Sequence, residues 1–383
     1  MSEKLYYKDS HINEFSATVL DCVETESGQW LVELDRTAFF PEGGGQYADT
    51  GHIDGVPVTD VQEEDGVIRH RTEGPLEIGT IVDCAIDWPA RFEKMQCHTG
   101  EHIISGIIHA LYGYDNVGFH LGEDYVTLDF NGMLDRSQLD QVEDIAAAVI
   151  AGNIPVETSF PEPGDLAMME YRSKLELTEN VRIVTIPGVD VCACCAPHVH
   201  RTGEVGMLKI LDAVKHKNGV RLNMTAGFRL LRDYRNRYEQ TVAVSGMLAV
   251  PQDSISEGVQ RLKDECSSLQ YRLNGARTAL ALTELDKQPL GSTNMAMFVA
   301  DWDYDVMIAV ADKGKSLCPG LFGIFSEEQG QFRYVISSES QDLRAQLKEI
   351  NAAIEGKGGG RPNLIQGRAA ADRETIQRWF DAR

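Results

Sequence analysis

The chain has 383 residues, a length that predicts two to four domains rather than a single core. Its 43% hydrophobic and 25% charged residues are typical of a globular protein and argue against disorder. The formal net charge of −23 excludes a protein that coats nucleic acid through an overall positive charge. Any contact with nucleic acid therefore requires local basic patches.

The N-terminus and the cysteines bear on the compartment. The opening MSEKLYYKDS lacks an apolar signal core, and no apolar run of about 18 residues is long enough to span a bilayer. Three of the eight cysteines, Cys192, Cys194 and Cys195, crowd into the motif CACC. In a reducing compartment such a cluster indicates metal binding or a reactive thiol. We therefore expect a cytoplasmic protein without a membrane partner.

Residues 1–88 are expected to form a small, barrel-like β-domain. Short β-prone runs such as SATVL and WLVEL alternate with turn signals such as ESGQ and EEDG. The stretch TAFFPEGGGQYADTG stands out, because Gly43, Gly44 and Gly45 permit a positive φ or a close backbone approach. The stretch lacks the Lys and Ser or Thr that end a phosphate-binding P-loop, and a plain glycine turn between strands is the alternative.

Residues 89–228 are expected to form a two-layer α/β core. A helix is predicted from Pro89 to Gly113, because apolar residues return at steps of three and four. YVTLDF, VRIVTI and MLKIL read as strands, SQLDQVEDIAAAVIAGN as a helix, and KHKNGVRLNM as a tight hairpin.

Residues 229–289 are expected to form a helical arm that ends near Pro289. Apolar residues repeat at alternating steps of four and three, which predicts a coiled coil or a helical hairpin; they are Ile255, Val259, Leu262, Cys266, Leu269, Leu273, Ala276 and Leu280. Residues 290–383 read as a small α/β domain that contains the glycine-rich GKGGGRPNLIQGRA. The expected fold class is α+β.

Two distant segments supply residues of the types that bind zinc. His98 and His102 lie one turn apart on the predicted helix, and the stretch DVCACCAPHVH supplies Cys194 and His198. Catalytic zinc sites commonly keep one position for water or substrate. A purely structural site closed by all four residues is therefore the alternative.

These motifs resemble a known family. RTAFFPEGGGQYADTG, HTGEHIISG, GFHLG with YVTLDF, and CCAPHVHRTGEVG are similar to the editing domain of alanyl-tRNA synthetase and to its free-standing AlaX relatives. The tail GKGGGRPNLIQGRA is similar to the glycine-rich motif of the synthetase's C-terminal DHHA1 domain. The resemblance spans nearly the whole chain and fits the long AlaX form.

The resemblance implies a set of site residues. Zinc ligands would be His98, His102, Cys194 and His198, although CCAPH replaces the family's usual CGGTH. Cys192, Cys195 and His200 would be neighbours, or substitutes for a ligand. Thr37 and Gln46 would form the polar pocket of the substrate. Apart from the resemblance, Asp129 in the LDF run is expected to orient a ligand histidine, and an ordinary acidic residue at the end of a strand is the alternative.

The resemblance also implies hydrolysis of the ester that joins a wrong amino acid, serine or glycine, to alanine tRNA. Zinc would activate water or position the substrate, and the sequence leaves both open. Contacts with tRNA are expected from Arg229, Arg232, Arg361 and Arg368. The arm or the C-terminal domain would join two subunits into a homodimer.

Three other functions are compatible with parts of the sequence. HTGEH satisfies the H-x-x-E-H pattern of a metalloprotease in which Glu101 is the general base, but that pattern leaves Cys194 and His198 unused. A noncatalytic protein could use zinc only to stabilise a surface that binds tRNA or another partner. A third possibility keeps the editing fold but changes the substrate to threonine tRNA.

Overall fold

The computed structural model describes residues 2–173, 181–286 and 293–383, and the chain divides into two compact units, Met1–Gln240 and Thr241–Arg383. The four expected domains are a finer division, which stays a prediction. Both Pro289 and the expected boundary at residues 289 and 290 lie outside the described residues. Within the described ranges, no helix combines the length and the apolar character needed to cross a membrane.

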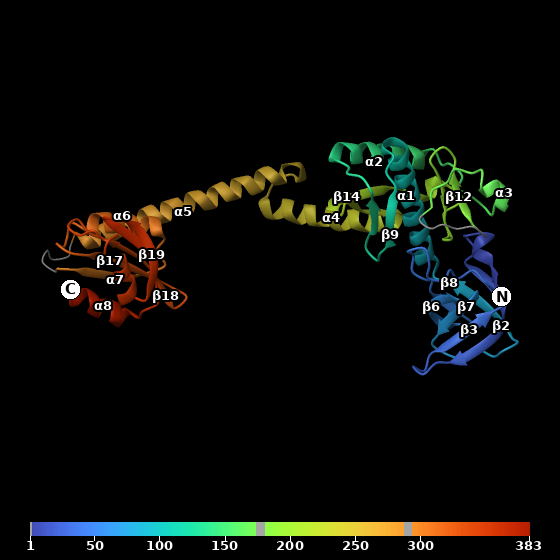
Figure 1. The fold of residues 1–383 in the computed structure, drawn as a ribbon, viewed down its shortest axis with the longest axis horizontal. Coiled ribbons are helices and arrows are strands. Elements are labelled where there is room, and N and C mark those ends of the chain that lie inside the picture. Colours follow the sequence, from blue (N-terminus) through green and yellow to red (C-terminus); the bar gives the residue numbers. More distant parts are fainter. Residues whose placement is uncertain (1, 174–180, 287–292) are drawn as a thin grey trace. The chain divides into compact units, whose positions relative to one another are not determined.

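The first unit begins with a closed six-stranded barrel, which confirms the barrel-like domain expected from the sequence (Figure 1). In barrel order the strands are β2 (Glu14–Glu24), β3 (Trp30–Leu34), β7 (Val67–Thr72), β6 (Val56–Glu64), β5 (Gly51–Ile53) and β8 (Ile81–Ile86). Alternating side chains such as Val32 and Leu34 are fully buried, as expected for strands with one face toward a core. A short 3-10 helix, η1 (Leu5–Tyr7), and the parallel pair β1 (Glu3–Lys4) and β4 (Arg36–Thr37) adjoin it.

Helix α1 (Trp88–Tyr112) follows the barrel directly and carries the first half of the metal motif. The Asp87 side chain accepts a hydrogen bond from the backbone N–H of Ala90 and Pro89 occupies the first turn, which are favoured N-terminal signals. Gly113 ends the helix in the left-handed conformation at φ 68°, as predicted from the sequence.

A four-stranded sheet packs with α1 and α2 to form the core that follows the barrel. The sheet runs in the order β14 (Leu208–His216), β15 (Gly219–Ala226), β10 (Val126–Phe130) and β9 (Asn116–Leu121), and α2 spans Arg136–Ala151. Apolar side chains of α1, α2 and the sheet form one buried cluster. This arrangement agrees with the two-layer core expected for residues 89–228.

A separate three-stranded sheet brings the cysteine-rich segment to α1. Its strands are β11 (Glu157–Ser159), β12 (Ile183–Ile186) and β13 (Asp190–Ala193); the short helices α3 (Pro163–Leu166) and η2 (Thr202–Val205) flank it. The segment that leads into β13 comes very close to α1 at Gly106. A Cβ atom on Gly106 would lie 2.3 Å from the carbonyl oxygen of Val189. Glycine at this position therefore lets β13 approach the helix.

Helix α4 (Gly227–Leu248) leads out of the first unit, and η3 (Gln252–Ser254) precedes the long α5 (Ile255–Leu285). The second unit has a five-stranded sheet in the order β16 (Met295–Ala300), β17 (Phe322–Glu328), β18 (Gln331–Ser337), β20 (Leu364–Ala369) and β19 (Gly356–Arg361). Its helices are α6 (Tyr304–Gly314), α7 (Leu347–Ala353) and α8 (Arg373–Asp381).

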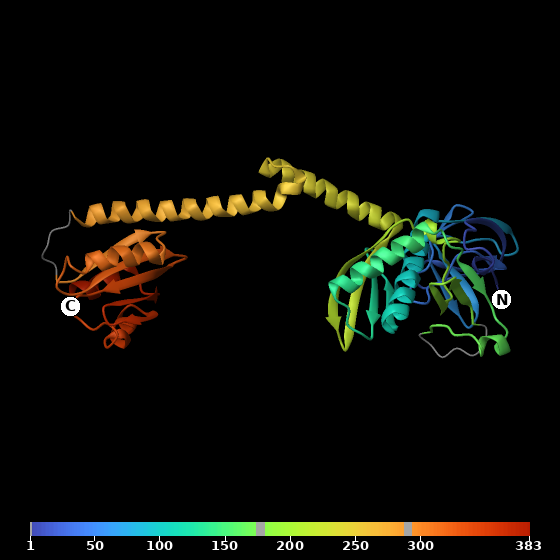
Figure 2. The ribbon, with the colours of Figure 1, turned by 90° about the horizontal axis from the view of Figure 1, so that it is seen from above.

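The second unit contains the glycine-rich tail and the long helix that were predicted from the sequence. The glycine-rich tail forms the β19–β20 hairpin at an edge of the sheet, and the end of α5 packs over α6 (Figure 2). The expected long helix is present as α5, but Leu262 and Leu273 of the apolar seam are 51% and 46% exposed. The coiled-coil pairing of this helix stays a prediction.

Candidate metal centre

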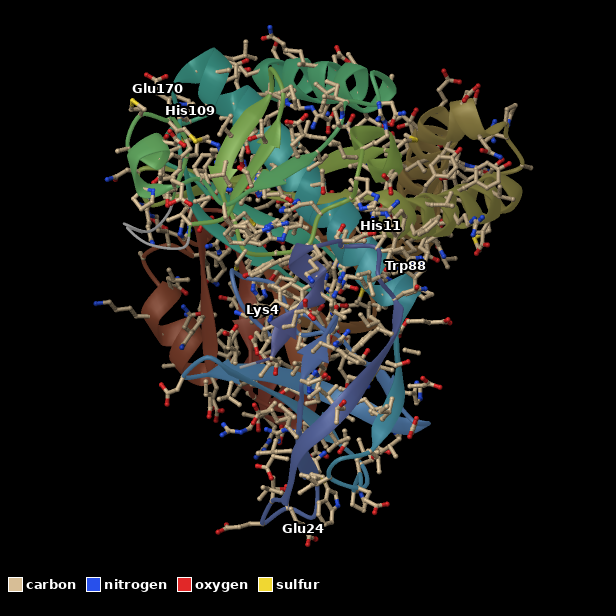
Figure 3. The ribbon with its side chains drawn as sticks, turned by 90° about the vertical axis from the view of Figure 1, so that its right-hand side faces the viewer. Lys4, His11, Glu24, Trp88, His109 and Glu170 are labelled. Carbon is tan, nitrogen blue, oxygen red and sulfur yellow. The ribbon has the colours of Figure 1, made fainter. Side chains whose placement is uncertain are left out.

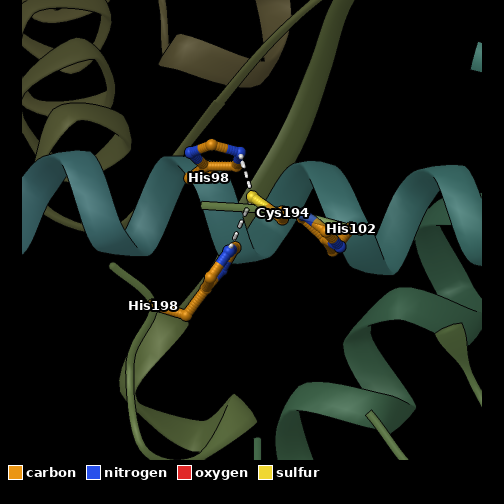
Figure 4. Close-up of side chains that lie close together, drawn as sticks. All are labelled: His98, His102, Cys194 and His198. Carbon is orange, nitrogen blue, oxygen red and sulfur yellow. Dashed lines mark hydrogen bonds between the residues drawn. The ribbon is translucent and has the colours of Figure 1, made fainter. Parts of the chain in front are cut away.

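Three buried histidines and a partly buried cysteine converge from α1 and from the segment after β13. His98 and His102 on α1 face Cys194 and His198 (Figure 4). The Cys194 Sγ atom lies 3.6 Å from Nε2 of His98 and 3.4 Å from Nε2 of His198. One ligand atom from each of the four residues lies within 4.8 Å of the others. The four residues predicted from the sequence therefore form one cluster.

Buried polar contacts fix the segment that carries Cys194 and His198. The Nη1 atom of Arg182 donates to the carbonyl oxygens of Cys194 and Ala196 at 2.9 and 2.8 Å. The Ser10 hydroxyl donates to the carbonyl oxygen of His198 at 2.6 Å. These side chains hold a loop in which CCAPH takes the place of the glycine-containing motif of the resembled family.

Each histidine of the cluster has a partner on its Nδ1 atom. The Nδ1–H of His98 donates to Oε1 of Gln46 at 3.0 Å, and that of His102 donates to Oδ2 of Asp190 at 2.8 Å. The Nδ1 atom of His198 lies 3.1 Å from the Thr99 hydroxyl. Because these contacts engage the Nδ1 atoms, the Nε2 atoms of the three rings are the ones that could bind a metal.

Electrostatics favour a thiolate in this cluster. Burial opposes ionisation of Cys194, but electrostatic attraction to His98 and hydrogen bonds from His102 and His198 outweigh it and hold the pKa of the thiol well below its ordinary value. Burial lowers the pKa of His198 to about 3, so this ring stays neutral. Burial also opposes the charge on His102, but Glu101 and Asp190 raise the pKa of this ring well above its ordinary value. A metal bound here would displace a proton from His102.

The donor set fits zinc. A thiolate and three imidazole nitrogens are ligands of the borderline-soft type that zinc prefers, and tetrahedral sites of four such ligands are common. The Nδ1 partners of the three rings match the usual surroundings of metal-bound histidines. The residues present are therefore suited to a Zn²⁺ ion.

The structure separates the two residues proposed for the substrate pocket. Gln46 is buried beside His98, and its Nε2 atom has no hydrogen-bond partner among the described residues. Thr37 is fully buried in the barrel, where its hydroxyl lies 2.8 Å from Nε2 of His70. Burial lowers the pKa of His70 to about 4, so Nε2 is an acceptor for the Thr37 hydroxyl. Thr37 thus contacts the barrel interior, and Gln46 contacts the cluster.

A glycine turn positions Gln46. Gly43 and Gln46 exchange two backbone hydrogen bonds of 3.0 Å, and Gly45 takes φ 81°. The carbonyl oxygen of Gly45 accepts from the N–H of Leu121 on β9 at 2.9 Å. A Cβ atom at Gly45 would lie 2.7 Å from the Phe119 ring, so the turn needs glycine for both its conformation and its packing.

Asp190 is a site residue that the sequence analysis missed. Its carboxylate contacts His102 and also accepts from Nε and Nη2 of Arg172, at 2.7 and 2.9 Å. Asp129, which was expected to orient a ligand, instead pairs with Arg221 at 2.7 Å on the neighbouring strand β15. The only sequence signal for Asp190 is an acidic residue four positions before Cys194.

A cavity of about 630 Å³ is lined in part by Asp190, the hydrogen-bond partner of His102. Arg172, Asp190 and Gly106 are among its lining residues. Its volume is in the range of small-ligand sites. Asp190 therefore links the cavity to His102.

The predicted tRNA-binding arginines lie in both units. Arg229 is largely buried and donates to the carbonyl oxygen of Gly122 at 2.6 Å, whereas Arg232 is exposed and pairs with Glu93. In the second unit, Arg361 ends the edge strand β19, and Arg368 on β20 is exposed and lies 3.2 Å from Glu328. Arg232, Arg361 and Arg368 are thus on the surface.

Glu101 is not arranged as the metalloprotease pattern alone would require. It is buried, and its Oε1 accepts from the Ser105 hydroxyl at 2.7 Å and from Nδ2 of Asn116 at 2.6 Å. Its Oε2 lies 3.7 Å from Nε2 of His102. The cluster also includes Cys194 and His198, which that pattern does not use.

Two family models match parts of the chain. The model described as "Threonyl and Alanyl tRNA synthetase second additional domain" matches residues 181–263, which include Cys194 and His198. The model described as "tRNA synthetases class II (A)" matches residues 2–90. The chain is also 27% identical to an alanine–tRNA ligase of Methanococcus maripaludis, over 98% of this chain but only 43% of the ligase.

Free-standing relatives match over nearly their whole length. The chain is 27% identical to the alanyl-tRNA editing protein Aarsd1 of Rattus norvegicus, over 95% of this chain and 93% of that protein. It is 32% identical to the alanyl-tRNA editing protein AlaX-L of Pyrococcus horikoshii, over 98% of this chain and 96% of that protein. The chain therefore belongs to the family of AlaX-type alanyl-tRNA editing proteins.

Proposed function

We propose that this protein is a zinc-dependent deacylase that hydrolyses alanine tRNA carrying serine or glycine. As a member of the alanyl-tRNA editing family, it is an enzyme that acts on mischarged tRNA. The observation that carries the zinc dependence is the convergence of His98, His102, Cys194 and His198. Family membership argues against the metalloprotease and against a noncatalytic zinc protein.

The chain's own residues prepare the site for this reaction. Gln46, Thr99 and Asp190 hold the three imidazoles with Nε2 directed toward Cys194. When bound there, zinc would supply a Lewis acid for the ester carbonyl or for a water molecule. Because the three histidines are buried, their interactions are weakly screened by solvent.

Gln46 is the residue that we propose for substrate recognition. Its Oε1 is engaged by His98, whereas its buried Nε2 has no partner among the described residues. A buried donor without a partner is unfavourable, so a substrate oxygen that accepts from Nε2 is stabilised. A site that hydrogen-bonds the serine hydroxyl rejects alanine more strongly than an apolar pocket does. Thr37 acts indirectly in this proposal, through strand β4, which precedes the glycine turn.

Surface arginines would bind the tRNA backbone. Arg232, Arg361 and Arg368 are exposed and can reach phosphates despite the negative net charge. Arg229 would act by holding the start of α4 through its contact with Gly122. We further propose a homodimer joined along the exposed apolar seam of α5.

The test is deacylation of alanine tRNA charged with serine, glycine or alanine. We expect the zinc-loaded protein to hydrolyse the seryl and glycyl esters and to spare the alanyl ester. His102→Ala should remove the activity toward seryl-tRNA, because it deletes a proposed metal ligand. His52→Ala, which changes an exposed barrel histidine, is the control and should retain the activity.

Two results would contradict the proposal. Undiminished turnover by folded His102→Ala would show that the cluster is not catalytic. The second is faster hydrolysis of serine from threonine tRNA than from alanine tRNA. That result would show that the protein acts on threonine tRNA. Circular dichroism of both variants separates loss of activity from loss of fold.

A further inference from the structure

A second group of metal-ligand side chains lies where the N-terminal segment meets the segment that carries His198. Asp9 and His11 precede β2, and His200 follows His198 by two residues. One carboxylate oxygen and one nitrogen from each ring all lie within 4.8 Å of one another. None of the three residues belongs to the candidate zinc centre, so the group needs its own explanation.

The two imidazoles are stacked face to face. The ring centroids of His11 and His200 are 3.6 Å apart, and the rings are inclined by 27°. His11 also packs against Trp88, at 5.3 Å between ring centroids (Figure 3). The Phe92 ring lies 6.1 Å from His11 between centroids. This packing limits the orientations of His11.

Carboxylates flank both rings. The Oδ1 atom of Asp9 lies 2.8 Å from Nε2 of His200 and also accepts from the backbone N–H of His11 at 2.8 Å. The Oε2 atom of Glu204 lies 2.8 Å from Nε2 of His11. Burial opposes the charge on Asp9, but the hydrogen bonds from His11 and His200 outweigh it and lower the pKa of the carboxyl. Asp9 therefore stays ionised near neutral pH.

We propose that Asp9, His11 and His200 bind a divalent transition-metal ion, with Glu204 within reach as a further ligand. Two imidazoles and one or two carboxylates suit Zn²⁺ or Co²⁺, and they do not suit Ca²⁺, which prefers oxygen ligands. Ligands of one zinc ion, bound at roughly 2.0–2.1 Å, lie at most about 4 Å apart. Asp9 and His200 are about half exposed, so small side-chain rotations can close the remaining distance.

The role of this site would be to clamp the loop of the candidate zinc centre. The ion would join residues 9–11 to residues 198–200, which are 187 or more positions apart in the chain. Ser10 already donates to the carbonyl oxygen of His198 between the two halves, at 2.6 Å. A metal on the flanking residues would add a second, stronger link at the same place.

The alternative is that these residues form only hydrogen-bonded His–carboxylate pairs. The chain offers an internal control for that case, because His109 and Asp115 form such a pair at 3.0 Å without a second ring. If pairing alone explained Asp9, His11 and His200, removing either histidine would leave metal binding unchanged.

The test counts bound metal in the full chain. We expect the wild type to bind one equivalent of Zn²⁺ more than His200→Ala does. The control His109→Ala should bind as much Zn²⁺ as the wild type. Equilibrium dialysis and mass spectrometry measure the bound metal. His11→Ala should lose the same equivalent. His200 is half exposed, so its variant keeps the test valid if His11→Ala fails to fold.

Titration with Co²⁺ distinguishes the two sites. Cobalt bound to a thiolate gives a charge-transfer absorption, whereas cobalt bound only to nitrogen and oxygen does not. We expect the equivalent lost in His200→Ala to lack this absorption. Equal metal content in the wild type and His200→Ala would overturn the proposal. If His200→Ala instead lost only the equivalent with the thiolate absorption, this would also overturn the proposal, by assigning His200 to the Cys194 centre.

Discussion

The three imidazoles of the candidate zinc centre depend on three different kinds of partner. Gln46 offers a neutral amide, Thr99 a hydroxyl and Asp190 a carboxylate. A carboxylate makes the stronger hydrogen bond to an imidazole and increases its basicity as a ligand. His102 is therefore the ring whose metal affinity depends most on its partner.

We predict that Asp190→Asn lowers zinc affinity by about 10–100-fold, the usual effect of losing such a partner. The substitution removes the negative charge that contacts His102 and pairs with Arg172. Competition with a chromophoric chelator measures the affinity. Asp129→Asn is the matched control, because that carboxylate pairs with Arg221 on the sheet and should leave zinc affinity unchanged. Equal affinities of the two variants would contradict the assignment of Asp190.

The clustering of the four proposed metal ligands could be predicted from the sequence, and the partners of these residues could not. The helical spacing places His98 and His102 on one face, and the resemblance adds Cys194 and His198. The partners depend on strand register: Asp129 lies directly opposite Arg221 in the β10–β15 pair. Register is a tertiary property that no spacing in the sequence reveals.

The glycine turn is the element that couples the barrel to the metal cluster. It places Gln46 against His98 while the carbonyl oxygen of Gly45 binds β9. Its conformation requires a positive φ at Gly44 and Gly45. The position of Gln46 therefore depends on the backbone of its neighbours.

We predict that Gly45→Ala strongly reduces deacylation of seryl-tRNA while zinc remains bound. The added methyl group would meet the ring and the carbonyl oxygen of Phe119 at 2.7 and 2.8 Å, and the turn must move away. The rate and the zinc content are the measurements. Gly28→Ala is the control, since Gly28 also has a positive φ, of 77°, but no atom within 4 Å of the added Cβ. Equal activity of the two variants would show that the turn does not position the substrate.

At the scale of elements, periodicity predicted the helices better than it predicted how strands are paired. The helix that begins near Pro89 ends at Gly113 as predicted. The Asn-Gly hairpin is present, but its loop is Lys217 and Asn218, and Gly219 belongs to the strand. A Cβ at Gly219 would lie 1.8 Å from the carbonyl oxygen of Phe130, so glycine serves sheet packing here. The barrel order pairs β2 with β8, a long-range contact that local patterns do not encode.

For the whole molecule, the exposed seam on α5 raises the question of assembly. Five apolar residues at heptad spacing are between 42% and 66% exposed; they are Val259, Leu262, Leu269, Leu273 and Leu280. Burying a leucine side chain contributes about 1.5–3 kcal/mol. A second copy of this helix would cover the seam on both chains at once.

We predict that the wild type is a dimer. The double variant Leu262→Glu, Leu273→Glu should be a monomer, because pairing through the seam would place the new carboxylates of two chains next to one another, and they would repel. Sedimentation velocity over a range of concentrations measures the mass. Tyr271→Glu is the control, because Tyr271 is 81% exposed and lies outside the seam. A wild type that stays monomeric at every concentration would rule out pairing through α5.

The side-chain amide of Gln46 has a fixed polarity, and this limits what can approach it. Its oxygen is committed to the His98 ring, so only N–H groups face any incoming molecule. Such an end attracts lone pairs and repels positively charged groups. If Gln46 binds the substrate as proposed, the ammonium group of the aminoacyl ester would bind elsewhere, and an oxygen atom of the ester would face the amide.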